Sequence, residues 1–568
     1  MTDDATRPIE VPVEPPMVAR APGGGRGRWI VAGVVAAVAI GITIGAVLLF
    51  GQQSTPVALQ YIPGDAALVM EIRMDLPGDQ MQALGNLLAH FPGFKDQSTL
   101  PEKIDEALSR LVAQVPGSSV DYRTDVKPLL DGPTFIGIRS FEDMSTSSDP
   151  KNMIVVATTN GAASCGTTFE GQTMTTEPYN GLTLSLTSEG KVACAVDGRY
   201  FLVGDPAGVK GAIDAHKNGT GINRSARYAA ARAGLGLDRL ATLYVDGVGL
   251  GKAMPSPDPS NPLSDLASAL PEWVMAGLRA ENDAMLFDIV IAPVPNASPL
   301  PSMRTYPPVH PISLTALAPA DSLAFVEAQG YTVGIHNLLL QLQAEPQIAA
   351  ALKQLDSVGG ANGLIDWVDD VGAVVIRQGD TPAGAVFLVA GDAATATAKA
   401  TTLKTVLGLG ALGGDLQVTE STIEGITVTN IHIPDISALL GNAVPGGTTG
   451  IPPVAVDFSI AVKDRTLIVG YGDGVMARLL GVKAGASLAE DPAFKRALAR
   501  SLPNPQSLVY VAAGSSLDWL EAAMAAAGAP AIPADVKPYI DPLEGVVISA
   551  TGDGTHGSAR IAITVTTP

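Results

Sequence analysis

One long internal repeat restricts what this chain can fold into more than any other feature of the sequence. Residues 195–245 align with residues 461–511 without a gap, at a constant offset of 266 positions. Gly204 matches Gly470 in this alignment, and many other positions exchange one apolar residue for another. Because self-similarity of this length indicates a repeated structural unit, we expect a tandem duplication with the same order of elements in both copies.

The first copy of the repeat contains clear local signals. The dipeptide Asp197-Gly198 separates two apolar runs, which predicts a β-hairpin. A glycine-containing turn follows the second strand and leads to a helix that begins near Val209, a second helix near residues 224–233 and a strand over residues 242–245. We expect Phe201 and its counterpart Leu467 to occupy equivalent buried positions, because an ungapped offset preserves the face that each strand residue occupies.

The composition limits the classes of partner. The chain has 568 residues, of which 46% are hydrophobic and 16% are charged, and its formal net charge is −20. A surface with this excess of acidic groups repels nucleic acid and anionic lipid headgroups, so we expect no nucleic-acid partner.

The N-terminal part predicts a membrane anchor. Residues 1–28 are rich in proline and glycine, which favours a disordered tail. Residues 29–50 contain no charge and would span about 33 Å as a helix, enough to cross a bilayer. Arginines precede this segment, whereas the first charge after it is Asp65. The positive-inside rule therefore predicts a single-pass protein of the cell membrane with a cytoplasmic N-terminus and an extracytoplasmic remainder. A cleaved signal peptide is the alternative, but the apolar run is longer than usual for one.

Small residues recur at four-residue spacing within this predicted span. They would line one helix face and permit close packing of two helices, so a homodimer through the transmembrane helix is one hypothesis. The alternative is chance in a segment rich in glycine, alanine and valine. The residues are Gly33, Ala37, Gly41 and Gly45.

The rest of the chain, after the predicted span, is predicted to form two related α+β domains with largely antiparallel sheets. The motif of Pro63, Asp65 and Glu71 returns as Pro319, Asp321 and Glu327. Prolines are dense between the two copies, which favours an extended linker. The predicted boundaries are 51–292 for the first domain, 293–311 for the linker and 312–568 for the second domain.

Two motifs carry a resemblance to a known family. The first domain opens with Tyr61-Ile-Pro-Gly-Asp-Ala after the predicted span, and residues 494–503 follow the pattern Phe-x-x-Ala-x-x-x-Leu-Pro. In these features, and in its long repeated ectodomain, the chain resembles the bacterial membrane-anchored family of domain of unknown function 3352. The resemblance implies no established activity and no site residues.

No arrangement of residues predicts catalysis. The turn Gly470-Tyr-Gly-Asp-Gly suggests a phosphate-binding loop, but it lacks the GxGxxG spacing, and its counterpart contains a proline, so we interpret it as a structural turn. The six histidines show no metal-ligand spacing, and no serine lies in a nucleophile motif. The adjacent acids Asp369 and Asp370 could act as an acid–base pair, although such neighbours usually form a solvated edge. We therefore expect no enzyme, no metal and no cofactor.

The chain has two cysteines, Cys165 and Cys194. Outside the membrane they would meet an oxidising environment, so we favour a disulfide between them. Cys194 aligns with Ile460, which leaves open the alternative that it is a small buried apolar residue.

These observations support three hypotheses about function. The first is a non-catalytic binding or scaffold module of the cell envelope, with an envelope protein or another envelope component as its partner. The second is a carrier or chaperone for an apolar ligand such as a lipid, suggested by the mean hydropathy of +0.26 and the leucine-rich helices. The third is a hydrolase, which no motif supports.

Overall fold

The structure is a computed structural model. It describes residues 56–73, 79–99, 101–103, 105–106, 109, 122–140, 152–168, 173–188, 190–236, 239–253, 270–292, 309–330, 366–378, 381–411, 416–434, 455–526, 531–534, 536–552 and 556–566.

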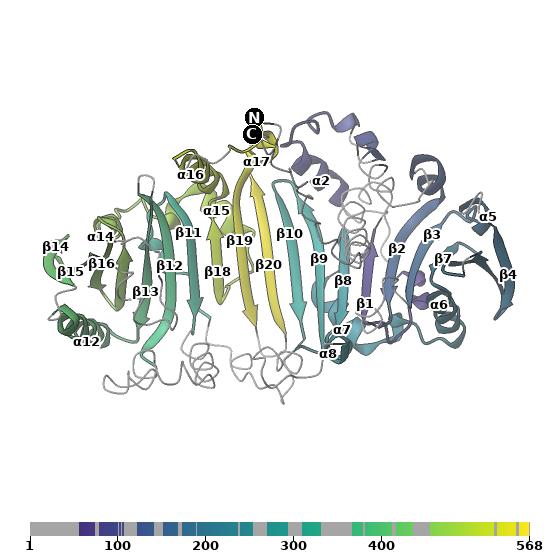
Figure 1. Ribbon diagram of the computed structural model, residues 1–568, viewed down its shortest axis with the longest axis horizontal. Helices are drawn as coiled ribbons and strands as arrows, with labels where there is room; N and C mark the ends of the chain where they lie inside the picture. The colour runs from purple at the N-terminus through teal and green to yellow at the C-terminus, as the bar shows by residue number, and fades with distance from the viewer. Residues whose placement is uncertain are drawn as a thin grey trace, which may run out of the picture.

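The described strands form one 20-stranded sheet, and they lie side by side along the long axis of the molecule (Figure 1). The strands before residue 300 are β1 (Leu68–Ile72), β2 (Leu130–Ile138), β3 (Met153–Thr159), β4 (Met174–Tyr179), β5 (Leu182–Thr187), β6 (Ala193–Asp197), β7 (Tyr200–Gly204), β8 (Ala241–Asp246), β9 (Trp273–Glu281) and β10 (Ala284–Ile291). Those after it are β11 (Ser322–Gln329), β12 (Val368–Gln378), β13 (Thr381–Ala390), β14 (Gln417–Ile423), β15 (Ile426–Ile433), β16 (Val456–Lys463), β17 (Thr466–Tyr471), β18 (Ser507–Val511), β19 (Leu543–Gly552) and β20 (Gly557–Val565).

Both halves of the sheet have the same strand order. From the outer edge to the centre, the first half runs β4, β5, β6, β7, β3, β2, β1, β8, β9 and β10. The second half runs β14, β15, β16, β17, β13, β12, β11, β18, β19 and β20. The halves meet where β10 pairs with β20, and every pairing in the sheet is antiparallel. We call the β10–β20 junction the seam.

Helices α6 (Pro206–Asn218), α7 (Ala226–Leu235), α14 (Val475–Leu480) and α15 (Pro492–Ala499) pack on one face of the sheet, which we call the helix face. The main cores lie beneath them, with Phe135 in the first half and Phe325 and Phe387 in the second, all fully buried. Complete burial of each ring stabilises the fold by about 1.5 to 3 kcal/mol. The other described α-helices are α2 (Gln80–Leu88), α5 (Cys165–Thr168), α8 (Gly247–Ala253), α12 (Ala393–Ala411), α16 (Ala513–Ala526) and α17 (Lys537–Ile540).

Local sequence explains the start and end of α6. The Asp205 side chain accepts hydrogen bonds from the backbone N–H groups of Ala207 and Gly208, and Pro206 occupies the first turn. Gly219 ends the helix with φ 63°, a left-handed conformation that glycine adopts without a Cβ penalty.

The repeated stretch has the expected order of elements in both copies. Each contains two strands in a hairpin, a helix, a short 3-10 helix, a second helix and a strand. The 3-10 helices, Ile222–Arg224 and Leu488–Glu490, differ by the 266-residue offset. The Tyr228 and Tyr244 rings meet edge to face at 5.2 Å, and their counterparts Phe494 and Tyr510 do so at 5.0 Å.

The strand residues also match between copies. Phe201 and Leu467 are both buried, as expected from the ungapped offset. Gly204 has a close backbone neighbour, since a Cβ there would lie 2.2 Å from the carbonyl oxygen of Met153. A Cβ at Gly470 would instead meet the side chains of Val475 and Ser459.

Candidate functional site: the apolar face of the sheet

The sheet face opposite the helix face carries an unbroken row of apolar side chains. Cross-strand pairing places one residue from each of nine neighbouring strands, β9 to β17 in spatial order, in this row. The residues are Leu278, Phe287, Ile561, Ile548, Val509, Val326, Ala373, Val386 and Val469. A parallel row of Met285, Ile563, Val546, Val511, Ala324 and Val375 lies beside it. We call the two rows together the apolar face.

The middle of the apolar face is open. Phe287, Val326, Val375, Val386 and Ile548 are 39%, 36%, 40%, 42% and 40% exposed, which is high for large apolar residues on a sheet. At the first-half end, α2 packs over Leu278 and Met285, and at the other end α12 packs beside Val469. The five exposed residues lie on β10, β19, β11, β12 and β13 (Figure 1).

The size of this surface suits an elongated ligand. Six strand spacings separate β10 from β13, which is about 29 Å at about 4.8 Å per spacing. A contiguous exposed apolar surface of this kind marks an interaction site for a protein, a membrane or a ligand.

The helix face behind the seam carries a charged network among buried apolar residues. The Asp288 carboxylate lies 3.0 Å from Nη2 of Arg239, 3.2 Å from Nε of Arg279 and 2.5 Å from Nε of Arg560. Asp288 and Arg560 are direct partners across the seam. Arg500 adds a second link between the halves by pairing with Glu281 and Asp283. All of these charges are partnered, so we interpret the network as a structural junction.

Glu71 and Glu327, which match in the repeated Pro-Asp-Glu motif, are both buried but have different partners. Glu71 pairs with Arg232 at 2.7 Å. Glu327 accepts hydrogen bonds from the backbone N–H groups of Ser313 and Leu314 at 3.0 and 2.9 Å. Burial raises the pKa of Glu327 above its ordinary value, although the two N–H groups act in the opposite direction. Since both carboxylates are enclosed by protein, neither is placed to react with a ligand.

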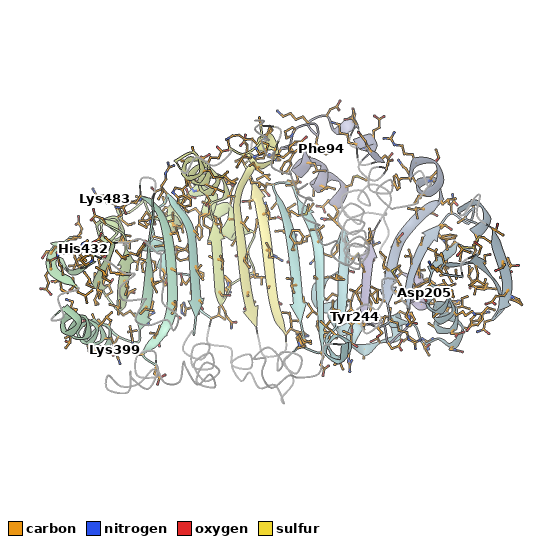
Figure 2. All side chains as sticks on the ribbon, in the orientation of Figure 1. Phe94, Asp205, Tyr244, Lys399, His432 and Lys483 are labelled. Atoms are coloured by element: carbon orange, nitrogen blue, oxygen red, sulfur yellow. A yellow bond between two sulfur atoms is a disulfide. The ribbon has the colours of Figure 1, made fainter. Side chains whose placement is uncertain are left out.

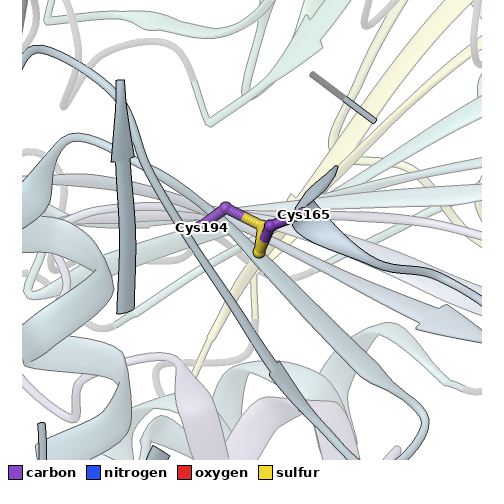
Figure 3. The surroundings of a disulfide bond; sticks show 2 residues. All are labelled: Cys165 and Cys194. Carbon is purple, nitrogen blue, oxygen red and sulfur yellow. A yellow bond between two sulfur atoms is a disulfide. The ribbon is translucent and has the colours of Figure 1, made fainter. Parts of the chain in front are cut away.

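Cys165 and Cys194 form a disulfide, in agreement with the preference from the sequence (Figure 3). The bond ties α5 to β6, and the side chains of Ala163 and Phe201 belong to the same small apolar cluster. Cys194 is fully buried, so both properties considered for it, pairing and apolar packing, are present together.

The predicted span at residues 29–50, with Gly33, Ala37, Gly41 and Gly45, lies outside the described residues. Within the part of the chain that the structure describes, no helix has the length and apolar character needed to cross a membrane.

The structure separates the adjacent acids that the sequence suggested as a pair. Asp370 is buried and lies 3.1 Å from Nε2 of His310. Asp369 is exposed and lies 3.7 Å from Nη1 of Arg465. The two carboxylates therefore differ in exposure and in partner, and they do not face a common substrate.

The glycine turn and the described histidines were considered for an anion site and a metal site. The N–H group of Gly472 donates to the Asp457 carbonyl at 2.9 Å, so this donor of the Gly470–Gly474 turn is already used. Among the described residues, no three histidine, cysteine, aspartate or glutamate side chains are grouped to hold a metal ion.

Sequence reasoning missed the apolar face. Strands such as β12 and β19 are apolar at most positions, a pattern that predicts strands buried on both sides. The pattern does not reveal that one side stays open, because this depends on where the helices pack.

The fold and this surface define a class of α+β protein with one wide antiparallel sheet, one helix-covered face and one exposed apolar face. Within it, the chain belongs to the family described as "Protein of unknown function (DUF3352)", whose model matches residues 29–565. No curated protein matches the sequence.

Two solved structures that are similar are crystal forms I and III of a protein named TP0453. They cover 46% and 43% of this chain and 90% and 82% of their own, at 7% and 10% identity. Their TM-scores are 0.23 and 0.22. A likeness this weak gives no information on function.

Proposed function

We propose that this protein is a non-catalytic binding protein of the cell envelope whose apolar face holds the acyl chains of a lipid. The observation that carries the proposal is the open middle of that face, with five large apolar side chains 36% to 42% exposed. This exposed apolar surface favours the lipid-carrier hypothesis over the protein-scaffold hypothesis, both of which the sequence suggests. The proposal requires no cofactor.

Acyl chains fit the dimensions and chemistry of this surface. The chains of one bilayer leaflet span about 15 Å, half of a hydrocarbon core of about 30 Å, so the face is wide enough for two chains end to end. Each buried methylene contributes about 0.8 kcal/mol, and the two rows contain no charged side chain that a chain would have to desolvate.

Photocrosslinking of the full chain tests this proposal. The protein would be reconstituted in nanodiscs that contain a phospholipid with a diazirine on its acyl chain, irradiated and digested. We expect adducts on peptides of β10, β19, β11, β12 and β13, in addition to residues 29–50. The double variant Val326→Lys with Ile548→Lys should lose the sheet adducts, because a bound chain would have to cover two charges.

Val536→Lys is the matched control, because Val536 is 44% exposed but lies outside the apolar face. It should leave the adducts unchanged. Adducts restricted to residues 29–50 would contradict lipid binding by the sheet and would favour an envelope protein as the partner.

The proposed location follows from the predicted span at residues 29–50. A protease added to intact spheroplasts should degrade the chain beyond residue 51 and leave residues 1–28 protected. Protection of the large domain would contradict the extracytoplasmic location. If the small residues of the span pack in a homodimer, Gly41→Ile should weaken dimer crosslinking in membranes.

We also propose that the two halves arose by tandem duplication of one ten-stranded unit. The identical strand order, the offset between the 3-10 helices and the matching aromatic pairs support this. A further match is the pair of isolated bridges, Pro63 with Gly221 and Pro319 with Ser487. Experimental structures of the two halves that superimpose poorly over these elements would contradict a duplication.

A further inference from the structure

The second half contains a polar cavity at a place where the first half has a packed helix. The cavity has a volume of about 460 Å³, within the range of about 300 to 1,000 Å³ typical of small-molecule sites. It lies at the outer end of the sheet, where Figure 2 labels His432. Most of its polar lining comes from three neighbouring strands: Gln417 and Thr419 of β14, Asn430 and His432 of β15, and Asp457 and Ser459 of β16. Apolar side chains, among them Ile431 and Phe458, line the rest.

A difference between the two halves opens this cavity. In the aligned repeat, Val209 is the fourth residue of α6, whereas its counterpart Val475 is the first residue of α14. The second half therefore lacks the first helical turn that α6 has. Gly472 and Gly474 lie in its place, and their φ angles of 102° and 68° are not helical. The start of α14 therefore leaves part of the sheet uncovered.

Two positions of the sheet beneath this gap are polar in the second half and apolar in the first. Ser459 pairs with Gly470 as Ala193 pairs with Gly204, so Ser459 replaces an alanine that is fully buried in the first core. By the same register, Asn430 takes the place of Leu186. Two apolar positions under a helix have thus become two hydrogen-bonding positions in a cavity.

The Ser459 hydroxyl needs a partner that the described residues do not supply. The residue is 6% exposed, and its Oγ is buried without a hydrogen bond. A buried hydroxyl without a partner costs about 1 to 3 kcal/mol, which a bound ligand would recover. Because Ser459 is not hydrogen-bonded to His432, this arrangement is not a nucleophile activated by a base.

The other groups around the cavity are arranged to recognise hydroxyl groups. Nδ1 of His432 lies 2.7 Å from Oδ1 of Asp457, and a carboxylate only accepts, so Nδ1 carries a proton; in the neutral form of the ring, Nε2 is an acceptor. The amide of Asn430 donates to Ser421 at 3.0 Å, which fixes its orientation and leaves its oxygen as an acceptor. The side chains of Gln417 and Thr419 can both donate and accept.

The charges of the lining exclude other ligand classes. It contains Asp457 and Asp473 but no lysine or arginine, so a phosphate or carboxylate would be repelled. An apolar ligand would leave the Ser459 hydroxyl unsatisfied. We propose that this cavity binds a small neutral sugar, a site separate from the apolar face and independent of the lipid proposal.

Binding of the full chain in nanodiscs to an array of neutral, acidic and phosphorylated mono- and disaccharides tests this inference. We expect binding to neutral sugars alone. Ser459→Ala should weaken it about threefold to tenfold, as expected for one lost hydrogen bond. The pair Ser459→Ala with Asn430→Leu, which restores the residues of the first half, should abolish it. If the double variant unfolds at a lower temperature, Ser459→Ala alone decides the result.

The control is Thr429→Val, which removes a buried hydroxyl of β15, the strand next to that of Ser459. This hydroxyl also has no hydrogen bond, but it belongs to the opposite side of the sheet. It should bind as the wild type does. No binding to any neutral sugar, stronger binding to acidic sugars, or equal loss in Thr429→Val and Ser459→Ala would overturn the inference. Lipid adducts on the apolar face should be the same in all of these variants, so failure here is distinguishable from failure of the lipid proposal.

Discussion

Asp288 is the residue whose loss should damage the seam most. Its side chain is 8% exposed and is shared by Arg239, Arg279 and Arg560. Asp288→Asn keeps the shape of the side chain but leaves three partly buried guanidinium groups without their common counter-charge. Removing one partner from a buried ion pair costs about 3 to 5 kcal/mol.

The variant Arg560→Gln is the comparison for Asp288→Asn, because the relative size of the two losses in stability tests the prediction. It removes only one of the three arginines, and Asp288 keeps the other two. The loss should be close to that of one hydrogen bond to a charged group, about 1.5 to 3 kcal/mol, because the other hydrogen bonds of Arg560, to the carbonyls of Arg500 and Ser501, are long at 3.5 and 3.3 Å. If the carboxylate organises the seam, Asp288→Asn must therefore be the more harmful of the two changes.

Hydrogen–deuterium exchange of the full chain measures both effects locally. For Asp288→Asn, amides of β10 and β20 should exchange about two to four orders of magnitude faster, the range that corresponds to 3 to 5 kcal/mol. Amides of β12 and β13, which pair far from the seam, should be unchanged. Equal acceleration in both variants, or a larger effect of Arg560→Gln, would refute the assignment of Asp288 as the centre of the network.

Three further predictions concern stability. Because burial raises the pKa of Glu327, the native state holds this proton more tightly than the unfolded chain, so the free energy of unfolding should fall as the pH rises from about 4.5 through the raised pKa. Glu327→Gln should remove that fall in urea titrations at several pH values, and an unchanged pH dependence would refute it. Cys194→Ala, which opens a loop with a sequence separation of 29, should lower stability by about 3 to 4 kcal/mol in chemical unfolding, and reductant should then have no further effect. Gly204→Ala should cost about 1 to 3 kcal/mol in thermal unfolding, because its Cβ would press on the Met153 carbonyl. Gly166→Ala, with open space around it and no left-handed backbone, should cost less, and the reverse order would contradict this.

Local features of the fold could be predicted from the sequence because they depend on neighbouring residues. The Asp197-Gly198 dipeptide sets a hairpin between β6 and β7, and the turn after Gly204 leads into α6. Because the second copy aligns with the first at a 266-residue offset, the same hairpin, turn and helix were predicted there. The helix predicted near residues 224–233 is α7, shifted by two residues.

The long-range features could not be predicted in this way. Asp288 and Arg560 are 272 positions apart, and nothing in either local pattern shows that they are partners. The sequence suggested two domains connected by a linker, but it did not reveal that their last strands would join the halves in one sheet. The polar cavity was equally hidden, because Ser459 becomes informative only when its register partner and the start of α14 are known.

The seam also has a consequence for the order in which the chain can fold during synthesis. At roughly 5 to 20 residues per second, the 272 residues between Asp288 and Arg560 take roughly 14 to 54 seconds to make. During that interval β10 has β9 on one side and an unpaired edge on the other, a template on which another nascent chain could add a strand. A ribosome that stops between β10 and β20 would therefore release a first half prone to aggregation, even if every residue of that half were native.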